Sequence, residues 1–256
     1  MMIDLFLIIT GLAVGSFLNV VIYRLPRHMQ IIFSRSRCPK CGEQIKFYDN
    51  IPVISYIVLR GKCRYCGSPI SLRYPFVEIL TALLFWASYR LTNNLFDLII
   101  SLYLSSAMVA ITFIDIDHRI IPNIITYPGV IVGILSSLVR YNFGLIQSLL
   151  GAGIGFGIMT LIAIVGTKAF KREAMGFGDV KLMALTGSFV GPQKVLFTIL
   201  IASCLGAIFG LIGLLLAKDK ESARLIPFGP YIAVASLLMF WWGDKIISWY
   251  LALFSL

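Results

Sequence analysis

The stretch LFDLIISLYLSSAMVAITFIDIDHR, residues 95–119, indicates what kind of fold this chain adopts. Its apolar part, Leu95–Ile114, has the length of about 20 residues that an α-helix needs to cross a bilayer. Asp115 and Asp117 follow directly, and ionisable groups at membrane depth are costly and usually functional. The stretch therefore predicts a membrane-spanning helix that brings carboxylates to one edge of the membrane.

Similar apolar runs lie on both sides of this stretch, and the composition agrees with them. Of the 256 residues, 59% are hydrophobic and 13% are charged, whereas a soluble domain has roughly 25% charged residues. These values exclude a disordered chain and disfavour a soluble enzyme. The runs are Ile3–Tyr23, Phe76–Arg90, Leu95–Ile114, Ile124–Val139, Leu145–Thr167, Leu182–Val190, Val195–Ala217 and Phe228–Leu253. They predict an all-α polytopic membrane protein with about eight transmembrane helices, or seven if the short run at 182–190 is left out.

The placement of Lys and Arg favours eight spans and predicts their orientation. If segment 24–75 is cytoplasmic and eight spans alternate, 18 of the 22 basic residues lie inside and 4 lie outside. With seven spans the last loops change sides and the contrast weakens. We therefore expect the N-terminus outside, and the first span to be a retained anchor, since Asp4 and no basic residue precedes it. The net charge of +10 then reflects topology, so the expected partner is the lipid bilayer and not nucleic acid.

Segment 24–75 contains two cysteine pairs with the spacing of a four-cysteine zinc ribbon. They read Cys38-Pro-Lys-Cys41-Gly and Cys63-Arg-Tyr-Cys66-Gly. Four thiolates can enclose a structural Zn²⁺, which would stabilise a segment too small to fold on its own core. The alternative is a redox pair or thiols that bind nothing. We expect three domains: a first transmembrane helix at 1–23, this cytoplasmic zinc-binding domain at 24–75, and a transmembrane catalytic helical domain at 76–256.

The chemistry is expected from two aspartates that the predicted topology places at one depth. Asp115 ends an inward-going helix, and Asp179, in Gly176-Phe-Gly178-Asp179-Val-Lys181, begins an outward-going one. Two adjacent carboxylates cannot both ionise easily, so one acts as base and the other as acid on a shared water, as aspartyl proteolysis requires. Gly176 and Gly178 would let the backbone approach a substrate strand.

Other interpretations of these aspartates remain open at this point. Each carboxylate could pair locally, Asp115 or Asp117 with Arg119 and Asp179 with Lys181. A transporter could use the aspartates as a proton relay, with the zinc-bound segment as a regulatory element. Residues i and i+2 of a helix point about 200° apart, so only one of Asp115 and Asp117 can face Asp179 if the helix continues. The sequence does not choose between them.

The order of the motifs along the chain resembles that of the bacterial type IV prepilin peptidases, or prepilin leader peptidases/N-methyltransferases, a GxGD aspartyl protease family. The resemblance covers nearly the whole chain. The cysteine pairs and both aspartate motifs match, with Pro122-Asn123 completing the first of these motifs. The other matching motifs are Gly15-Ser-Phe-Leu-Asn19 with Arg24-Leu-Pro26, Asp49-Asn50-Ile-Pro52, Arg73-Tyr-Pro75-Phe-Val-Glu78 and Ile226-Pro-Phe-Gly-Pro-Tyr231.

The resemblance implies an endopeptidase that removes the basic leader of type IV prepilins or pseudopilins, cutting after a glycine near the cytoplasmic face of the bacterial inner membrane. It implies that Asp115 and Asp179 are catalytic, with support from Gly176, Gly178, Asp117 and Lys181. It also implies methylation of the new N-terminus by S-adenosylmethionine, for which no binding residues can be assigned. A methyltransferase without protease activity is disfavoured by the intact aspartates. Neither the physiological substrate nor the oligomeric state follows from the sequence.

Overall fold

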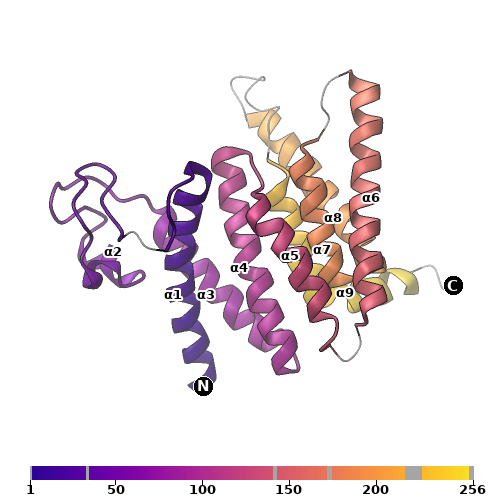
Figure 1. Ribbon diagram of the computed structural model, residues 1–256, viewed down its shortest axis with the longest axis horizontal. Helices are drawn as coiled ribbons and strands as arrows, with labels where there is room; N and C mark the ends of the chain where they lie inside the picture. The colour runs from indigo at the N-terminus through magenta and orange to yellow at the C-terminus, as the bar shows by residue number, and fades with distance from the viewer. Residues whose placement is uncertain (1, 33–34, 141–142, 172–174, 217–226, 254–256) are drawn as a thin grey trace. The chain divides into compact units, whose positions relative to one another are not determined.

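The computed structural model describes residues 2–32, 35–140, 143–171, 175–216 and 227–253, and its regular elements are helices (Figure 1). The long helices are α1 (Met2–Arg24), α3 (Arg73–Leu91), α4 (Leu95–His118), α5 (Asn123–Ser136), α6 (Leu145–Phe170), α7 (Phe177–Val190), α8 (Pro192–Leu216) and α9 (Gly229–Ala252). Short helical turns, η1 (Leu25–Arg27), η2 (Phe47–Asn50) and α2 (Ile54–Val58), occupy the segment between α1 and α3.

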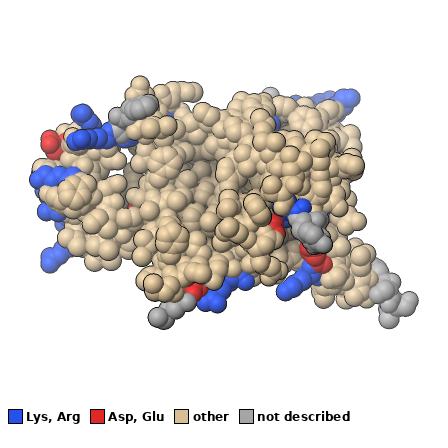
Figure 2. Space-filling model, turned by 60° about the horizontal axis from the view of Figure 1, so that its bottom comes forward, with Lys and Arg blue, Asp and Glu red and all other residues tan. Residues whose placement is uncertain are grey.

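Each apolar run of the sequence coincides with one long helix, which confirms the all-helical prediction. Ala217, the predicted end of the run that begins at Val195, lies outside the described residues. Within the described residues, four helices are long and apolar enough to cross a membrane: Met2–Arg27, Leu95–His118, Leu145–Ala169 and Pro192–Gly213. Asn123–Ser136 is a shorter apolar helix. Uncharged side chains cover most of the face in Figure 2, as lipid contact requires.

Contacts divide the chain into two compact units, Met1–Ala110 and Ile111–Leu256. In the first unit, α1 packs closely along α3 because two glycines face it. A Cβ atom at Gly11 would lie 2.6 Å from the Cα of Ala82, and one at Gly15 would lie 2.6 Å from the Cα of Glu78. This four-residue spacing of small residues is typical of close helix pairs in membranes. Asn19 joins the same pair of helices through a hydrogen bond from its Nδ2 to the Tyr74 carbonyl at 3.0 Å.

Replacing Gly15 by Ala is expected to destabilise the first unit by about 1–3 kcal/mol, because the added methyl group overlaps the backbone of α3. The free energy of unfolding in mixed micelles, measured by titration with denaturing detergent, tests this expectation. Gly153→Ala is the matched control, since a Cβ atom at Gly153 of α6 meets no atom within 4 Å. Equal stability of the two variants would contradict the packing argument.

In the second unit α7 is the central helix, with contacts to α5, α6, α8 and α9. Nine of its fourteen residues are buried, from Val180 to Val190, so it is apolar on all sides because protein surrounds it. Gly151 and Gly187 let α6 approach it, since a Cβ atom at either would overlap the other's carbonyl oxygen. The helix ends at Val190, the next residue is Gly191, whose φ of +85° favours glycine, and Pro192 begins α8.

Candidate active site and metal centre

The structure distinguishes the two aspartates at the end of α4. Asp115 is buried, with 6% of its surface exposed, whereas Asp117 is exposed. The helix ends just afterwards, where Arg119 takes a left-handed conformation with φ of +55° and its N–H donates to the Asp115 carbonyl at 2.8 Å. The chain then turns into α5, so the last turn of α4 presents Asp115, and not Asp117, to the interior of the unit.

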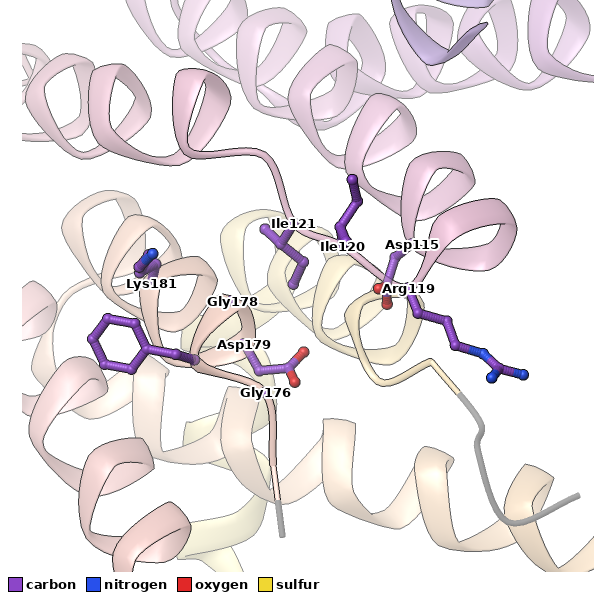
Figure 3. Close-up of a pocket in the computed structure, with 9 residues that line it drawn as sticks. Asp115, Arg119, Ile120, Ile121, Gly176, Gly178, Asp179 and Lys181 are labelled. Atoms are coloured by element: carbon purple, nitrogen blue, oxygen red, sulfur yellow. The ribbon is translucent and has the colours of Figure 1, made fainter. Parts of the chain in front are cut away.

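Asp115 and Asp179 line the same cavity of about 300 Å³ (Figure 3). Asp179 lies in the first turn of α7, and its half-buried side chain points toward the side of the cavity where Asp115 lies. The other lining residues are Arg119, Ile120, Ile121, Gly176, Phe177, Gly178 and Lys181. Two carboxylates from helix ends 64 positions apart in the sequence therefore meet in a space large enough for water and a peptide backbone.

A third helix end contributes a donor that no sequence motif predicts at the site. The backbone N–H of Gly229, the first residue of α9, donates to Asp115 Oδ2 at 2.9 Å. The sequence signal was Pro230 at the start of the last apolar run, since proline is typical of the first turn of a helix. Sequence alone marked it as a landmark but provided no reason to place it beside Asp115.

The suggestion that Lys181 pairs with Asp179 is wrong. The Lys181 Nζ donates to Asn123 Oδ1 at 2.8 Å and lies 5.4 Å from the Tyr127 ring centroid and 4.8 Å from that of Phe177. Its ammonium group thus links the start of α5 to the first turn of α7. This contact joins the segment that follows Asp115 to the helix that carries Asp179.

Breaking this link is expected to lower kcat/KM by about 10- to 100-fold for any reaction that the aspartate pair carries out, because small displacements of reacting groups are costly. Lys181→Met and Asn123→Ala should each show this loss, and the double variant should lose no more than either single variant. A double-mutant cycle on kcat/KM measures the coupling. Additive losses would indicate that the two residues act independently.

The two glycines of the second aspartate motif differ in their surroundings. A Cβ atom at Gly178 would lie 3.0 Å from the Cβ of Ile121, so Gly178 serves the close approach of α7 to the chain after α4. A Cβ atom at Gly176 would meet only Asp179 Oδ2, at 3.6 Å. Gly176 is exposed and lines the cavity, so of the two it is the one that leaves backbone open to a bound chain.

The four cysteines of segment 24–75 form a second site, built from two turns of the same geometry. In the first turn the N–H of Gly42 donates to the Cys38 carbonyl, and in the second the N–H of Gly67 donates to the Cys63 carbonyl, at 2.9 and 3.0 Å. Gly42 and Gly67 have φ of +72° and +67°, which favours glycine directly after the second cysteine of each pair. The repeated motif therefore folds as a repeated structure.

The donor set fits a tetrahedral metal ion. The four Sγ atoms all lie within 4.8 Å of one another, and Cys38 Sγ and Cys66 Sγ are 3.9 Å apart. Zinc–sulfur bonds of about 2.3 Å in a tetrahedron place sulfurs about 3.8 Å apart. The backbone N–H of Cys41 lowers the pKa of the Cys38 thiol against the effect of desolvation. At Cys41 the backbone of Glu43 acts in the same direction, but desolvation and the neighbouring thiols outweigh it and raise the pKa of that thiol. Four clustered cysteines could thus hold a metal.

Two polar contacts organise segment 24–75, and the second of them joins this segment to α3. The Arg64 guanidinium contacts both carboxylate oxygens of Asp49, at 2.8 and 2.5 Å, and holds the pKa of Asp49 below its ordinary value. The buried carboxylate of Glu78 accepts from the N–H of Val53 at 2.8 Å. These contacts give the motif residues Asp49 and Glu78 structural partners within the first unit.

Together, the fold and the two sites define a class of protein: a multi-pass membrane protein with an aspartate pair in one cavity and a separate four-cysteine cluster. Comparison with known sequences identifies the family. The family described as "Bacterial Peptidase A24 N-terminal domain" matches residues 9–91, and the "Type IV leader peptidase family" matches residues 102–211. No solved structure matches the chain.

Curated relatives are similar over most of the chain. The prepilin leader peptidase/N-methyltransferase of Aeromonas hydrophila is 36% identical over 95% of this chain and 92% of its own length. That of Pseudomonas aeruginosa is 37% identical over the same shares. That of Myxococcus xanthus is 44% identical over 86% of this chain, which spans only 65% of the relative's length. The chain belongs to the type IV leader peptidase family.

Proposed function

We propose that this chain removes the leader peptides of type IV prepilins or pseudopilins and that Asp115 and Asp179 carry out the cleavage. The single observation that supports this most directly is their position in one cavity, Asp115 buried and Asp179 half-buried. Family membership supplies the substrate class, since the similar curated proteins are named prepilin leader peptidases/N-methyltransferases.

The aspartate pair suits hydrolysis of a peptide bond. A carboxylate can take a proton from water while a neighbouring carboxylic acid protonates the scissile carbonyl oxygen. The exposed backbone at Gly176 leaves room for an extended substrate segment beside Asp179. A cavity bounded by the ends of α4 and α7 accommodates such a segment at the edge of the apolar helices.

The proposed topology places this chemistry at the cytoplasmic side of the bacterial inner membrane. In this topology the eight long helices of the described residues all cross the bilayer, the N-terminus is outside, and the domain at 24–75 lies in the cytoplasm. Support comes from the positions of Lys and Arg, 18 of 22 on one side in this arrangement. α7, although short, is included because other helices of the protein surround it.

The cysteine cluster is proposed to hold one structural Zn²⁺ that stabilises the domain at 24–75. Cys38, Cys41, Cys63 and Cys66 would bind it, leaving no position for a substrate or water. When bound, the ion supplies folding energy and not reaction chemistry. In this proposal the residues of the aspartate cavity do not bind the zinc ion, and their chemistry does not need it.

Methyl transfer from S-adenosylmethionine to the new N-terminus is part of the proposal because the relatives' name includes it. Co-expression of the chain with a prepilin, followed by mass determination of the prepilin's N-terminus, tests both activities. Leader loss with an added methyl group is the expected result. Leader loss alone would restrict the function to proteolysis, and an intact leader would overturn the proposal.

A further inference from the structure

Gly229, the first residue of α9, contacts the carboxylate of Asp115. The Gly229 N–H donates to Asp115 Oδ2 at 2.9 Å, and both residues are buried. The first N–H groups of a helix have no partner within the helix and give its N-terminus a partial positive charge. The next residue, Pro230, has no N–H. The available donor at this helix end is therefore directed at a carboxylate from another helix.

The position of this donor is fixed by packing. The Tyr231 N–H donates to the Phe228 carbonyl at 3.1 Å, which closes the first turn of α9. The Tyr231 ring stacks on Phe209 of α8 with ring centroids 5.8 Å apart. A Cβ atom at Gly229 would lie 2.6 Å from Asp115 Oδ2, closer than real contacts allow. Only glycine brings the backbone this near to the carboxylate.

A backbone N–H bonded to a carboxylate stabilises its charged form. Asp179 differs in this respect, since within the described ranges no hydrogen-bond donor contacts its carboxylate. The other charged groups that line the cavity are Arg119 and Lys181. The Lys181 ammonium is bonded to Asn123, and Figure 3 shows the Arg119 side chain extending away from Asp179. Within the described ranges, the charged form of Asp115 is therefore stabilised by a hydrogen bond that Asp179 lacks.

We propose that Gly229 is a positioning residue that keeps Asp115 ionised, so that Asp115 is the general base and Asp179 the general acid of peptide hydrolysis. This inference rests on the proposed function. Asp115 takes a proton from water as the water oxygen bonds to the scissile carbonyl carbon, and Asp179 gives its proton to the carbonyl oxygen. Asp115 then returns its proton to the amide nitrogen as the C–N bond breaks. Asp179 regains a proton from the tetrahedral diol, which restores both residues.

The test replaces Gly229 by glycolic acid through nonsense suppression, because the resulting backbone ester removes the N–H and adds no side chain. Loss of this donor destabilises the charged form of Asp115. The acidic limb of the kcat/KM profile for prepilin cleavage should therefore move about 1–2 pH units upward. Above that limb the activity should recover, and KM should change by less than about twofold. A purely structural role for Gly229 would not shift the limb.

A second variant tests positioning. Gly229→Ala should lower kcat about 100-fold or more by displacing Asp115, while Gly153→Ala, in open space on α6, should keep wild-type kcat. Thermal unfolding reports whether the Gly229→Ala variant folds. If that variant does not fold, the ester variant alone tests the proposal. If the wild-type protein cleaves prepilin but the ester variant shows an unmoved acidic limb or a shifted alkaline limb, Asp115 is not the general base held by Gly229. Absence of wild-type cleavage would instead overturn the proposed function.

Discussion

Replacing Asp115 or Asp179 by Asn is expected to lower kcat/KM for prepilin cleavage by at least about 10³-fold. Each aspartate is proposed to transfer a proton in the transition state, and general acid–base groups contribute about 10²–10⁴-fold. Asn has nearly the same size, and at position 115 its oxygen can still accept from the Gly229 N–H, so folding should be kept. Cleavage in detergent or nanodiscs, followed by mass spectrometry of the prepilin, measures the loss.

Asp117→Asn is the matched control for this experiment. It makes the same chemical change two residues away on a side chain that is exposed, whereas Asp115 is buried. We expect its kcat/KM to stay within about threefold of wild type, because it holds no proton-transfer role in the cavity. Wild-type activity in Asp115→Asn or Asp179→Asn, or a loss in Asp117→Asn as large as theirs, would contradict the assignment of the catalytic pair.

Removing one cysteine of the proposed zinc site is expected to abolish metal binding and unfold segment 24–75. Structural zinc contributes an apparent free energy of about 10–16 kcal/mol in small zinc-folded peptides. In Cys63→Ser the zinc content, measured by mass spectrometry, should fall from about one ion per chain to near zero. Trypsin should then cut rapidly within 24–75, which contains ten Lys and Arg residues.

Cys204→Ser provides the control, since Cys204 is an exposed residue of α8 and no member of the cluster. It should keep the metal and the resistance to trypsin. Chelation of the wild-type protein should reproduce the effect of Cys63→Ser. Full zinc content or full protease resistance in Cys63→Ser would contradict the structural-metal proposal without bearing on the aspartates.

Local sequence patterns were sufficient for the helices and the cysteine turns. Apolar runs predicted every long helix, because lipid and a buried helix core both require continuous apolar sequence. Even the short α7 was outlined by its run and by Gly191-Pro192, whose conformational preferences end one helix and begin the next. The paired C-x-x-C-Gly turns were equally local, since each closes through contacts within five residues.

The arrangement of the aspartate cavity depended on contacts that no local pattern contains. The sequence predicted Asp115 and Asp117 at one membrane edge but did not choose between them, because the choice depends on which face of α4 the rest of the unit covers. The pairing of Lys181 with Asn123 and the donation from Gly229 to Asp115 join residues 58 and 114 positions apart. Sequence alone therefore determined which helices form and where the carboxylates lie along them. Tertiary packing decided which carboxylate is buried and what it meets, because burial and hydrogen bonding are properties of neighbouring helices in space.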